Sequence, residues 1–198
     1  GTPRSRPRAI LSLRDVAVVV GSVLVVGAVL FAAAGVWPPL VAIESPSMEP
    51  SVERGDMVAI SDPDRFSETA ADDRGVVTAA AADGYGRLGG AGDVIVFDPP
   101  GRTGAPIIHR AQLRVEAGEN WYGEANASYL GDADSCAELS ACPAPYDGYV
   151  TKGDNNGEYD QATGIAPVVR PSWIEAKAQF RIPELGWIRL LITGKAFA

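Results

Sequence analysis

The chain contains a single histidine, and two polar segments elsewhere in the sequence could work with it. His109 lies in the apolar run PIIHR, Ser47 lies in the proline-flanked segment SPSMEP, and Asp154 and Asp160 lie in and after KGDNN. A serine hydroxyl is a weak nucleophile until a neighbouring base accepts its proton. A carboxylate can then fix the tautomer of an imidazole base and stabilise the imidazolium that forms. These residue types predict a serine hydrolase with Ser47 as nucleophile, His109 as general base and a carboxylate that orients His109.

Such a reaction forms an oxyanion that needs hydrogen-bond donors, and the backbone N–H of Ser47 and the hydroxyl of Ser45 are the local candidates. Each motif taken alone has a simpler interpretation. A lone histidine in an apolar run is more often structural, SPSMEP could be an ordinary loop, and KGDNN could be a polar turn. KGDNN also lacks the alternating oxygen ligands and the final Glu of an EF-hand, so we expect no metal and no other cofactor.

A long uncharged segment precedes these motifs. Residues 16–37 read VAVVVGSVLVVGAVLFAAAGVW. About 20 such residues cross the hydrocarbon core of a bilayer at 1.5 Å per residue. Basic residues before a membrane span favour a cytoplasmic N-terminus, and this chain has four of them: Arg4, Arg6, Arg8 and Arg14.

We therefore expect a basic cytoplasmic segment at 1–14, a transmembrane helix at 15–37 and an extracytoplasmic catalytic domain at 38–198. The protein would then be a single-pass protein of the cell membrane, with Trp37 at the interface and Pro38 and Pro39 ending the helix. A cleavable signal peptide is the alternative, because the sequence AAAG at 32–35 could mimic a cleavage site.

Beyond Pro39 the pattern changes to short apolar runs separated by Gly, Pro and Asp. Several of these runs alternate or are rich in β-branched residues, which predicts strands and a mainly β domain. The runs are DMVAI, GVVTA, DVIVF, PIIHRAQLRV, GYVTK and IEAKAQFRI. The C-terminal LGWIRLLITGKAFA is too short to span a bilayer, so we expect either an amphipathic end or the beginning of a second span.

The segment 120–149 is poor in strand signals and is interpreted as a long surface insertion. It contains Cys136 and Cys142, the only two cysteines of the chain. Outside the cytoplasm these two would form a disulfide in a small loop. Free or metal-bound thiols are the alternatives, although the one histidine lies elsewhere in the sequence.

The charge balance limits the possible partners. The chain has 25 acidic and 17 basic residues and a net charge of −8, with a pI near 4.7. Nucleic-acid binding needs clustered Lys and Arg, so no nucleic acid is expected. An acidic surface with few lysines suits high salt, although codon bias in a GC-rich genome would give a similar composition.

Five motifs in one order, SPSMEP, RGDMV, GDVIVF, PIIHR and KGDNN followed by Asp160, resemble the signal peptidase I family. The resemblance is to the archaeal and endoplasmic-reticulum type and covers about residues 44–160. Together with the acidic composition it suggests a halophilic archaeon. It implies a β-rich catalytic domain near the membrane surface. It also implies a membrane-bound serine endopeptidase that removes signal peptides from secretory preproteins after small residues, close to the secretion translocon.

The resemblance also implies individual roles. Ser47 matches the nucleophile, and His109 matches the base where bacterial enzymes carry Lys. Asp160 matches the orienting acid, Asp154 a nearby essential Asp, and Ser45 an oxyanion-hole hydroxyl. Two departures from the family pattern are the proline between the two serines, where Gly is commoner, and the insertion at 120–149. The rival interpretations are a β domain that binds a ligand without chemistry and a Ser/Lys self-cleaving protease that uses the lysine of KGDNN.

Overall fold

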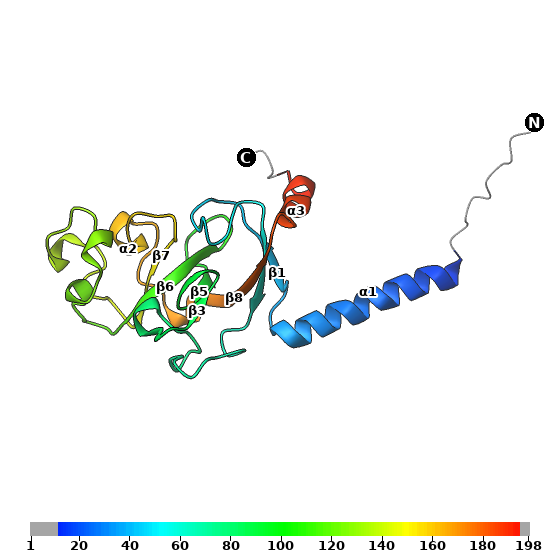
Figure 1. Cartoon of the computed structure of the whole chain (residues 1–198), viewed down its shortest axis with the longest axis horizontal. Helices are drawn as coiled ribbons and strands as arrows, with labels where there is room; N and C mark the ends of the chain where they lie inside the picture. The colour runs from blue at the N-terminus through cyan, green and yellow to red at the C-terminus, as the bar shows by residue number, and fades with distance from the viewer. Residues whose placement is uncertain (1–11, 195–198) are drawn as a thin grey trace, which may run out of the picture.

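The computed structural model describes residues 12–194 and places an antiparallel β domain at one end of a long helix (Figure 1). Within these residues the chain forms three α-helices and eight strands. The first helix, α1, spans Leu13–Ala34. Ser12 begins it with a capping box, in which the Ser12 side chain accepts from the Asp15 N–H and the Asp15 carboxylate accepts from the Ser12 N–H. This reciprocal pair satisfies two backbone donors that a helix start would otherwise leave unpaired.

The helix ends earlier than predicted. Gly35 adopts the left-handed conformation with φ of 77°, and its N–H donates to the Phe31 carbonyl. A left-handed glycine closes a helix because it carries no Cβ penalty there. Gly35, and not Pro38 or Pro39, therefore stops α1.

Helix α1 has 22 residues and a mean hydropathy of 2.8 in its most apolar window, and none of that window is buried by the domain. It is long and apolar enough to cross a membrane, a property that a signal sequence can share. Arg4, Arg6 and Arg8 lie outside the described residues. The predicted topology therefore stays a prediction.

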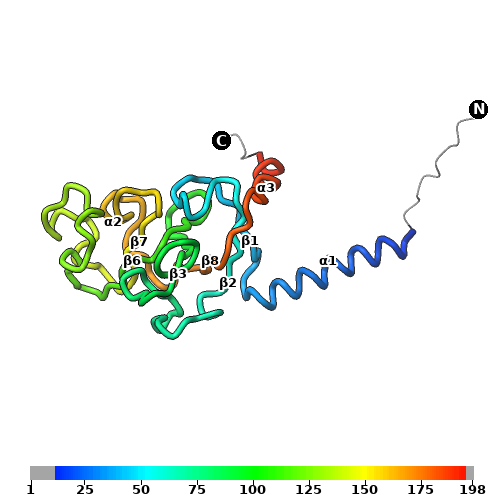
Figure 2. The backbone as a smooth tube through the Cα atoms, in the orientation of Figure 1, coloured from blue at the N-terminus to red at the C-terminus, as the bar shows by residue number. Residues whose placement is uncertain are grey.

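The main sheet has six strands in the order β1-β2-β8-β5-β6-β7, and every neighbouring pair is antiparallel. Its strands are, in this order, Leu40–Ala42, Met57–Ser61, Ile174–Ile182, Val94–Phe97, Ile107–Val115 and Gly148–Lys152. A small hairpin pairs β3 (Gly86–Arg87) with β4 (Gly90–Ala91). Figure 2 follows the chain through these elements. Two short helices complete the set: α2 (Asp160–Thr163) and α3 (Gly186–Ile192).

Residues on β5 alternate between two clusters of buried side chains. Val94 and Val96 pack into one cluster with Ile43, Met48 and Val58. Ile95 and Phe97 pack into the other, on the opposite face of the sheet. Successive strand residues point to opposite faces, so β5 is covered on both sides. This explains why VIVF, the part of the predicted run that forms β5, is apolar at every position.

Five of the six predicted runs coincide with strands, and the sixth does not. The run GVVTA at 75–79 is buried but forms no strand. Its N–H groups bind carboxylates in place of a neighbouring strand. The Val76 N–H donates to Asp72 over 3.1 Å, and the Val77 N–H donates to Asp93 over 2.8 Å. Side-chain acceptors can satisfy buried backbone donors outside a sheet.

The stretch between β6 and β7, residues 116–147, is named here the disulfide lobe. It contains three single-turn 3₁₀ helices, Trp121–Gly123, Ala127–Tyr129 and Cys136–Glu138. The domain is therefore less rich in strands than the sequence predicted. The predicted disulfide between Cys136 and Cys142 is confirmed.

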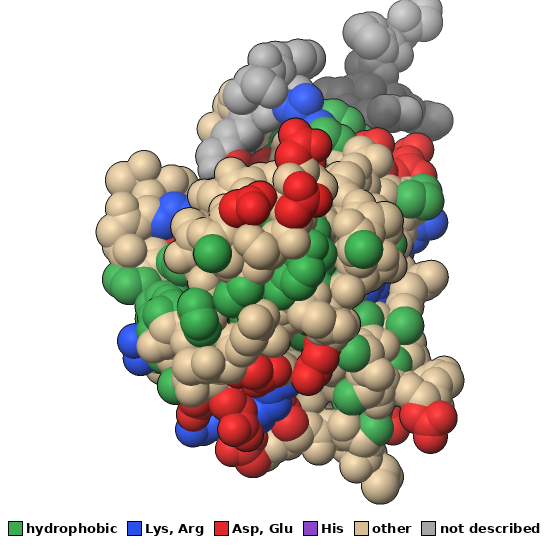
Figure 3. All heavy atoms as spheres, turned by 90° about the vertical axis from the view of Figure 1, so that its left-hand side faces the viewer, with side chains coloured by type: hydrophobic (Ala, Val, Ile, Leu, Met, Phe, Trp, Pro, Cys, Tyr) green, Lys and Arg blue, Asp and Glu red, His purple; other side chains and the backbone are tan. Residues whose placement is uncertain are grey.

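The lobe is more than a surface insertion, because it has a core of its own. Trp121 is fully buried, and its indole N–H donates to the Ala141 carbonyl over 2.9 Å. Leu130, Leu139 and Cys142 pack in the same cluster as Tyr159, the residue before Asp160. The lobe lies at the end of the domain farthest from α1 (Figure 1). Figure 3 faces this end and shows several separate groups of acidic side chains with few basic ones.

Candidate active site

His109 is the third residue of β6, opposite Ile95 of β5, and it is 4% exposed. Its Nδ1 lies 2.7 Å from Oδ2 of Asp160, the first residue of α2, which is completely buried. The same Oδ2 accepts a hydrogen bond of 2.7 Å from the Thr151 hydroxyl on β7. With Nδ1 as the donor to Asp160, the imidazole keeps Nε2 as an acceptor. This is the tautomer that a general base needs.

Gly153 separates Nε2 of His109 from the segment that contains Ser47. A Cβ added to Gly153 would lie 2.9 Å from Nε2 and 2.6 Å from the Ser47 carbonyl oxygen. No side chain fits at this distance, so glycine is required for the close approach. The glycine of KGDNN therefore brings the base and the nucleophile segment together.

The nucleophile segment, residues 44–50, is a loop tied to the turn at 153–156. The Asn155 N–H donates to the Ser47 carbonyl over 2.9 Å, and the Asn155 side-chain amide donates to the Pro46 carbonyl over 3.1 Å. The Ser45 and Ser47 hydroxyls lie 3.2 Å apart. Met48 is buried in the core directly after Ser47 and anchors the segment. Ser47 itself is half-buried and lines a cleft.

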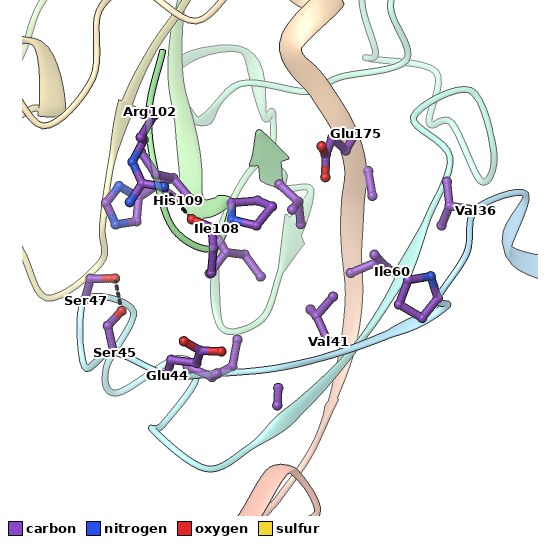
Figure 4. A pocket seen from close by; sticks show the side chains of 18 of the residues that line it. Val36, Val41, Glu44, Ser45, Ser47, Ile60, Arg102, Ile108, His109 and Glu175 are labelled. Carbon is purple, nitrogen blue, oxygen red and sulfur yellow. Dashed lines mark hydrogen bonds between the residues drawn. The ribbon is translucent and has the colours of Figure 1, made fainter. Parts of the chain in front are cut away.

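That cleft has a volume of about 910 Å³ and is lined by Ser45, Ser47 and His109. These three lie together at one end of it, whereas Val36 lies at the other end, where the chain arrives from α1 (Figure 4). The floor between the two ends is mostly apolar, with lining residues that include Val41, Ile43, Ile60, Val96, Ile108 and Ala176. The predicted nucleophile, base and oxyanion-hole residues therefore share one cleft, and Asp160 lies behind His109.

Asp154 lies close by, but none of its described contacts is with His109. It forms a two-point pair with Arg110, with Nε to Oδ1 at 2.8 Å and Nη2 to Oδ2 at 2.6 Å. Arg110 follows His109 on β6, so their side chains project to opposite faces of the sheet. Arg110 also donates to the Arg87 carbonyl over 2.9 Å. Asp160, and not Asp154, is thus the carboxylate that orients His109. Asp154 instead binds Arg110, whose side chain lies on the opposite face of β6.

Lys152 has a place in the site that the sequence did not predict. Its ammonium is buried and donates to the Gly153 carbonyl over 2.9 Å and the Asn156 carbonyl over 2.6 Å. It also lies 4.6 Å from the ring centre of Tyr129, which belongs to the disulfide lobe. Burial lowers the pKa of Lys152, although Asp154 and Asp160 act in the opposite direction. Lys152 thus braces the 153–156 turn that holds Ser47.

Thr151 is the second residue that sequence reasoning missed. Its hydroxyl donates to the carboxylate of Asp160, and its N–H donates to Oε1 of Gln161 over 2.9 Å. The sequence did contain a signal for this role, because a threonine inside an apolar strand needs a hydrogen-bond partner for its buried hydroxyl. The identity of that partner depends on the distance between β7 and α2, which the sequence does not reveal.

Across residues 12–194, no group of three or more His, Cys, Asp or Glu side chains is arranged to hold a metal ion. The site offers the Ser47 hydroxyl and the His109 imidazole, which line the same cleft, and a buried carboxylate that binds Nδ1 of the imidazole and leaves Nε2 as an acceptor. This is the arrangement that activates a serine for acyl transfer.

No protein-family model matches this chain, and no curated protein matches it.

Proposed function

We propose that the protein is a membrane-anchored serine endopeptidase of the signal peptidase I type, which removes signal peptides from exported preproteins. The observation that carries the proposal is that Ser47 and His109 line one cleft, with Gly153 between Nε2 of His109 and the Ser47 carbonyl oxygen and with Nδ1 of His109 bound to the buried Asp160. In this proposal α1 crosses the cell membrane with its N-terminus in the cytoplasm, and the catalytic domain lies outside.

The proposed reaction begins when Oγ of Ser47 attacks the scissile carbonyl carbon and Nε2 of His109 accepts the hydroxyl proton. Asp160 stabilises the imidazolium that forms. The carbonyl oxygen becomes an oxyanion and receives hydrogen bonds from the Ser47 N–H and the Ser45 hydroxyl. Collapse of the intermediate breaks the C–N bond, and the departing amine of the mature protein takes the proton from His109.

The signal peptide then remains as an ester on Ser47. Nε2 of His109 accepts a proton from water, whose oxygen attacks the ester carbonyl carbon. The C–O bond to Ser47 breaks, the serine regains a proton from the imidazolium, and the signal peptide leaves with a free carboxylate. Each proton that His109 accepts is returned, so the enzyme ends in its starting state.

The cleft favours an extended substrate that approaches from the membrane side. It runs from Trp37 and Pro38, directly after α1, to Ser47. The roughly ten residues between Trp37 and Ser47 span at most about 35 Å when fully extended, so the nucleophile stays near the outer membrane face. The segments at 41–44 and 105–108 flank the cleft and could pair with a peptide main chain. Small residues before the cut are proposed on the basis of the family resemblance.

The proposal is tested with the full chain in lipid vesicles and one preprotein in two forms. The forms differ only in the residue before the cut, which is Ala in one and Phe in the other. We expect cleavage of the Ala form and none of the Phe form, with both forms bound to the same extent. Ser47→Ala is the control for contaminating proteases. Equal cleavage of the two forms would contradict the assignment to this class of peptidase.

A further inference from the structure

Helix α3 is apolar on two opposite sides. Its inner side contains Leu190, which is buried, and Trp187, which is half-buried. Its outer side presents Ile188 at 58% exposure, Leu191 at 58% and Ile192 at 81%. A surface helix of a water-soluble domain normally directs polar residues outward, whereas a helix that is apolar all round is buried or meets lipid. Arg189 is exposed and is the one charged residue of α3, so the exposed part of this helix has fewer polar residues than contact with water would favour.

Packing against the domain fixes α3 in place. A Cβ added to Gly55 would lie 2.1 Å from Nε1 of Trp187, so the indole sits directly on that glycine. Gly186 approaches the Asp56 carbonyl so closely that a Cβ there would lie 2.3 Å from the oxygen. The Arg54 guanidinium lies 6.0 Å from the Trp187 ring centre. With its inner side fixed in this way, α3 presents its apolar outer side in a defined direction.

Helix α3 lies at the end of the domain from which α1 leaves. In Figures 1 and 2 the longest axis of the molecule is horizontal, and α3 lies at about the same level along it as the C-terminal end of α1. The disulfide lobe occupies the opposite end. Another exposed apolar residue, Phe66, lies near the end of α1 and is 59% exposed. It follows Arg65, whose guanidinium donates to the Ala32 carbonyl over 2.6 Å.

We propose that the outer side of α3, formed by Ile188, Leu191 and Ile192, lies in the headgroup region of the membrane that α1 crosses, together with Leu185 directly before the helix. An interfacial helix buries its apolar side at the boundary between headgroups and acyl chains. The partner is thus a lipid surface. With α1 as the first attachment and α3 as the second, the domain cannot turn freely about α1, and the cleft keeps one orientation relative to the bilayer.

The inference rests on the proposed membrane anchoring of α1 and is independent of peptidase activity. Its test therefore uses the full chain with Ser47→Ala, inserted in vesicles of phosphatidylcholine and phosphatidylglycerol. Both native cysteines form the disulfide, so an introduced cysteine is the only free thiol among residues 12–194. An environment-sensitive fluorophore is attached at Ile188→Cys or, as the matched control, at the exposed Ala127→Cys of the disulfide lobe.

We expect the label at position 188 to emit at shorter wavelength, to be quenched by lipids brominated near the headgroup, and to be severalfold less sensitive to aqueous iodide than the label at 127. The additional change Leu191→Asp should reverse these differences, because a carboxylate is costly at that depth. Equal iodide quenching at both positions would overturn the inference. If the label at 188 loses its protection from iodide when more lipid is added and the chains are diluted in the bilayer, the inference is overturned too. In that case a second copy of the chain, and not lipid, would cover α3. Preprotein cleavage by the unmodified chain, measured separately, decides the proposed function alone.

Discussion

The two halves of the candidate site are built in different ways. His109 and Asp160 lie in regular structure, are almost completely buried, and have a hydrogen bond of 2.7 Å between them. Ser47 lies in a loop, is half-buried, and is held through backbone contacts with Asn155. Its neighbour Ser45 is exposed. The sheet and α2 therefore hold His109 and Asp160 in place, whereas a turn positions Ser47.

This difference separates two kinds of defect. A change in the buried half should remove the chemistry, because no other group can take over a proton acceptor fixed in the core. A change in the turn at 153–156 should leave Ser47 and His109 present but less well placed. A small misplacement of reacting groups lowers a rate without abolishing it. The predictions below test this separation, beginning with the largest expected effect.

The largest effect is expected for Ser47→Ala and His109→Ala. Each should lower the single-turnover rate of preprotein cleavage by about four to six orders of magnitude, and the double variant should be little worse than either, because residues that act as one unit are non-additive. Ser172→Ala, an exposed serine elsewhere, is the control. A double variant whose loss equals the product of the two single losses would mean that the two residues act independently.

Asp160→Asn should cost about 10⁴-fold in rate, since the neutral amide no longer stabilises the imidazolium or selects its tautomer. Thr151→Val removes one hydrogen bond to the same oxygen and should cost roughly tenfold, in line with about 1 kcal/mol for such a bond. Both are measured as kcat at saturating preprotein in vesicles. Full activity of Asp160→Asn would leave only a Ser/His pair.

Asp154→Asn is the matched change on the other side of β6. It leaves the pair of His109 and Asp160 intact but weakens a two-point pair with Arg110, whose side chain is 4% exposed. Leaving that guanidinium without its charged partner should lower the free energy of unfolding by about 3 kcal/mol. Below the melting temperature the loss of rate should stay far smaller than for Asp160→Asn. The reverse ranking would exchange the roles of the two carboxylates.

Lys152→Met tests the turn. Without the ammonium, the carbonyls of Gly153 and Asn156 lose their donor, and we expect kcat to fall roughly tenfold with KM nearly unchanged, since hydrogen bonds to charged groups contribute about 1.5–3 kcal/mol. Because burial lowers the pKa of Lys152, with Arg110 adding to this effect and both nearby carboxylates opposing it, the wild type should lose part of its activity in alkaline solution. Lys152→Met should lack this alkaline loss. An alkaline loss of equal size in the variant would exclude Lys152 as its source.

The smallest effect concerns Asp72, which supports the buried run at 75–79. Burial opposes its charge, but hydrogen bonds from the Tyr149 hydroxyl, backbone N–H groups and Arg114 outweigh it and lower the pKa of Asp72. A lowered pKa in the folded state gives stability that is present at neutral pH and is lost as the pH falls through that value. Asp72→Asn should lower the free energy of unfolding by about 1 kcal/mol at neutral pH, and the difference should narrow in acid. A difference that does not change with pH would contradict this account.

The regular half of the molecule could be predicted better than the rest. Strands β5, β6, β7 and β8 follow from apolar and β-branched runs, because burial in a sheet constrains residue type along the whole strand. The run at 75–79 has the same composition but meets carboxylates where a neighbouring strand would be, and composition does not distinguish these two environments. The end of α1 was misplaced because Gly35 stops a helix as well as proline does.

The candidate site shows the same limit. His109 could be singled out because the chain has no other histidine. The choice between Asp154 and Asp160 could not be made, since only five residues separate them and only the folded chain shows which carboxylate reaches His109. The brace by Lys152 and Tyr129 joins residues of two segments that no local pattern connects. In the same way, the core of the disulfide lobe was hidden by a sequence rich in Ala, Asp and Ser.

In the proposed function, Ser47, activated by His109, cuts preproteins after their signal peptides. The measurement that tests it most directly is mass spectrometry of the products, after a preprotein is incubated with the full chain in vesicles. The account predicts one new N-terminus, directly after a small residue at the end of the apolar signal segment, and no such product with Ser47→Ala. An intact preprotein with the wild-type chain, or the same product from Ser47→Ala, would contradict it.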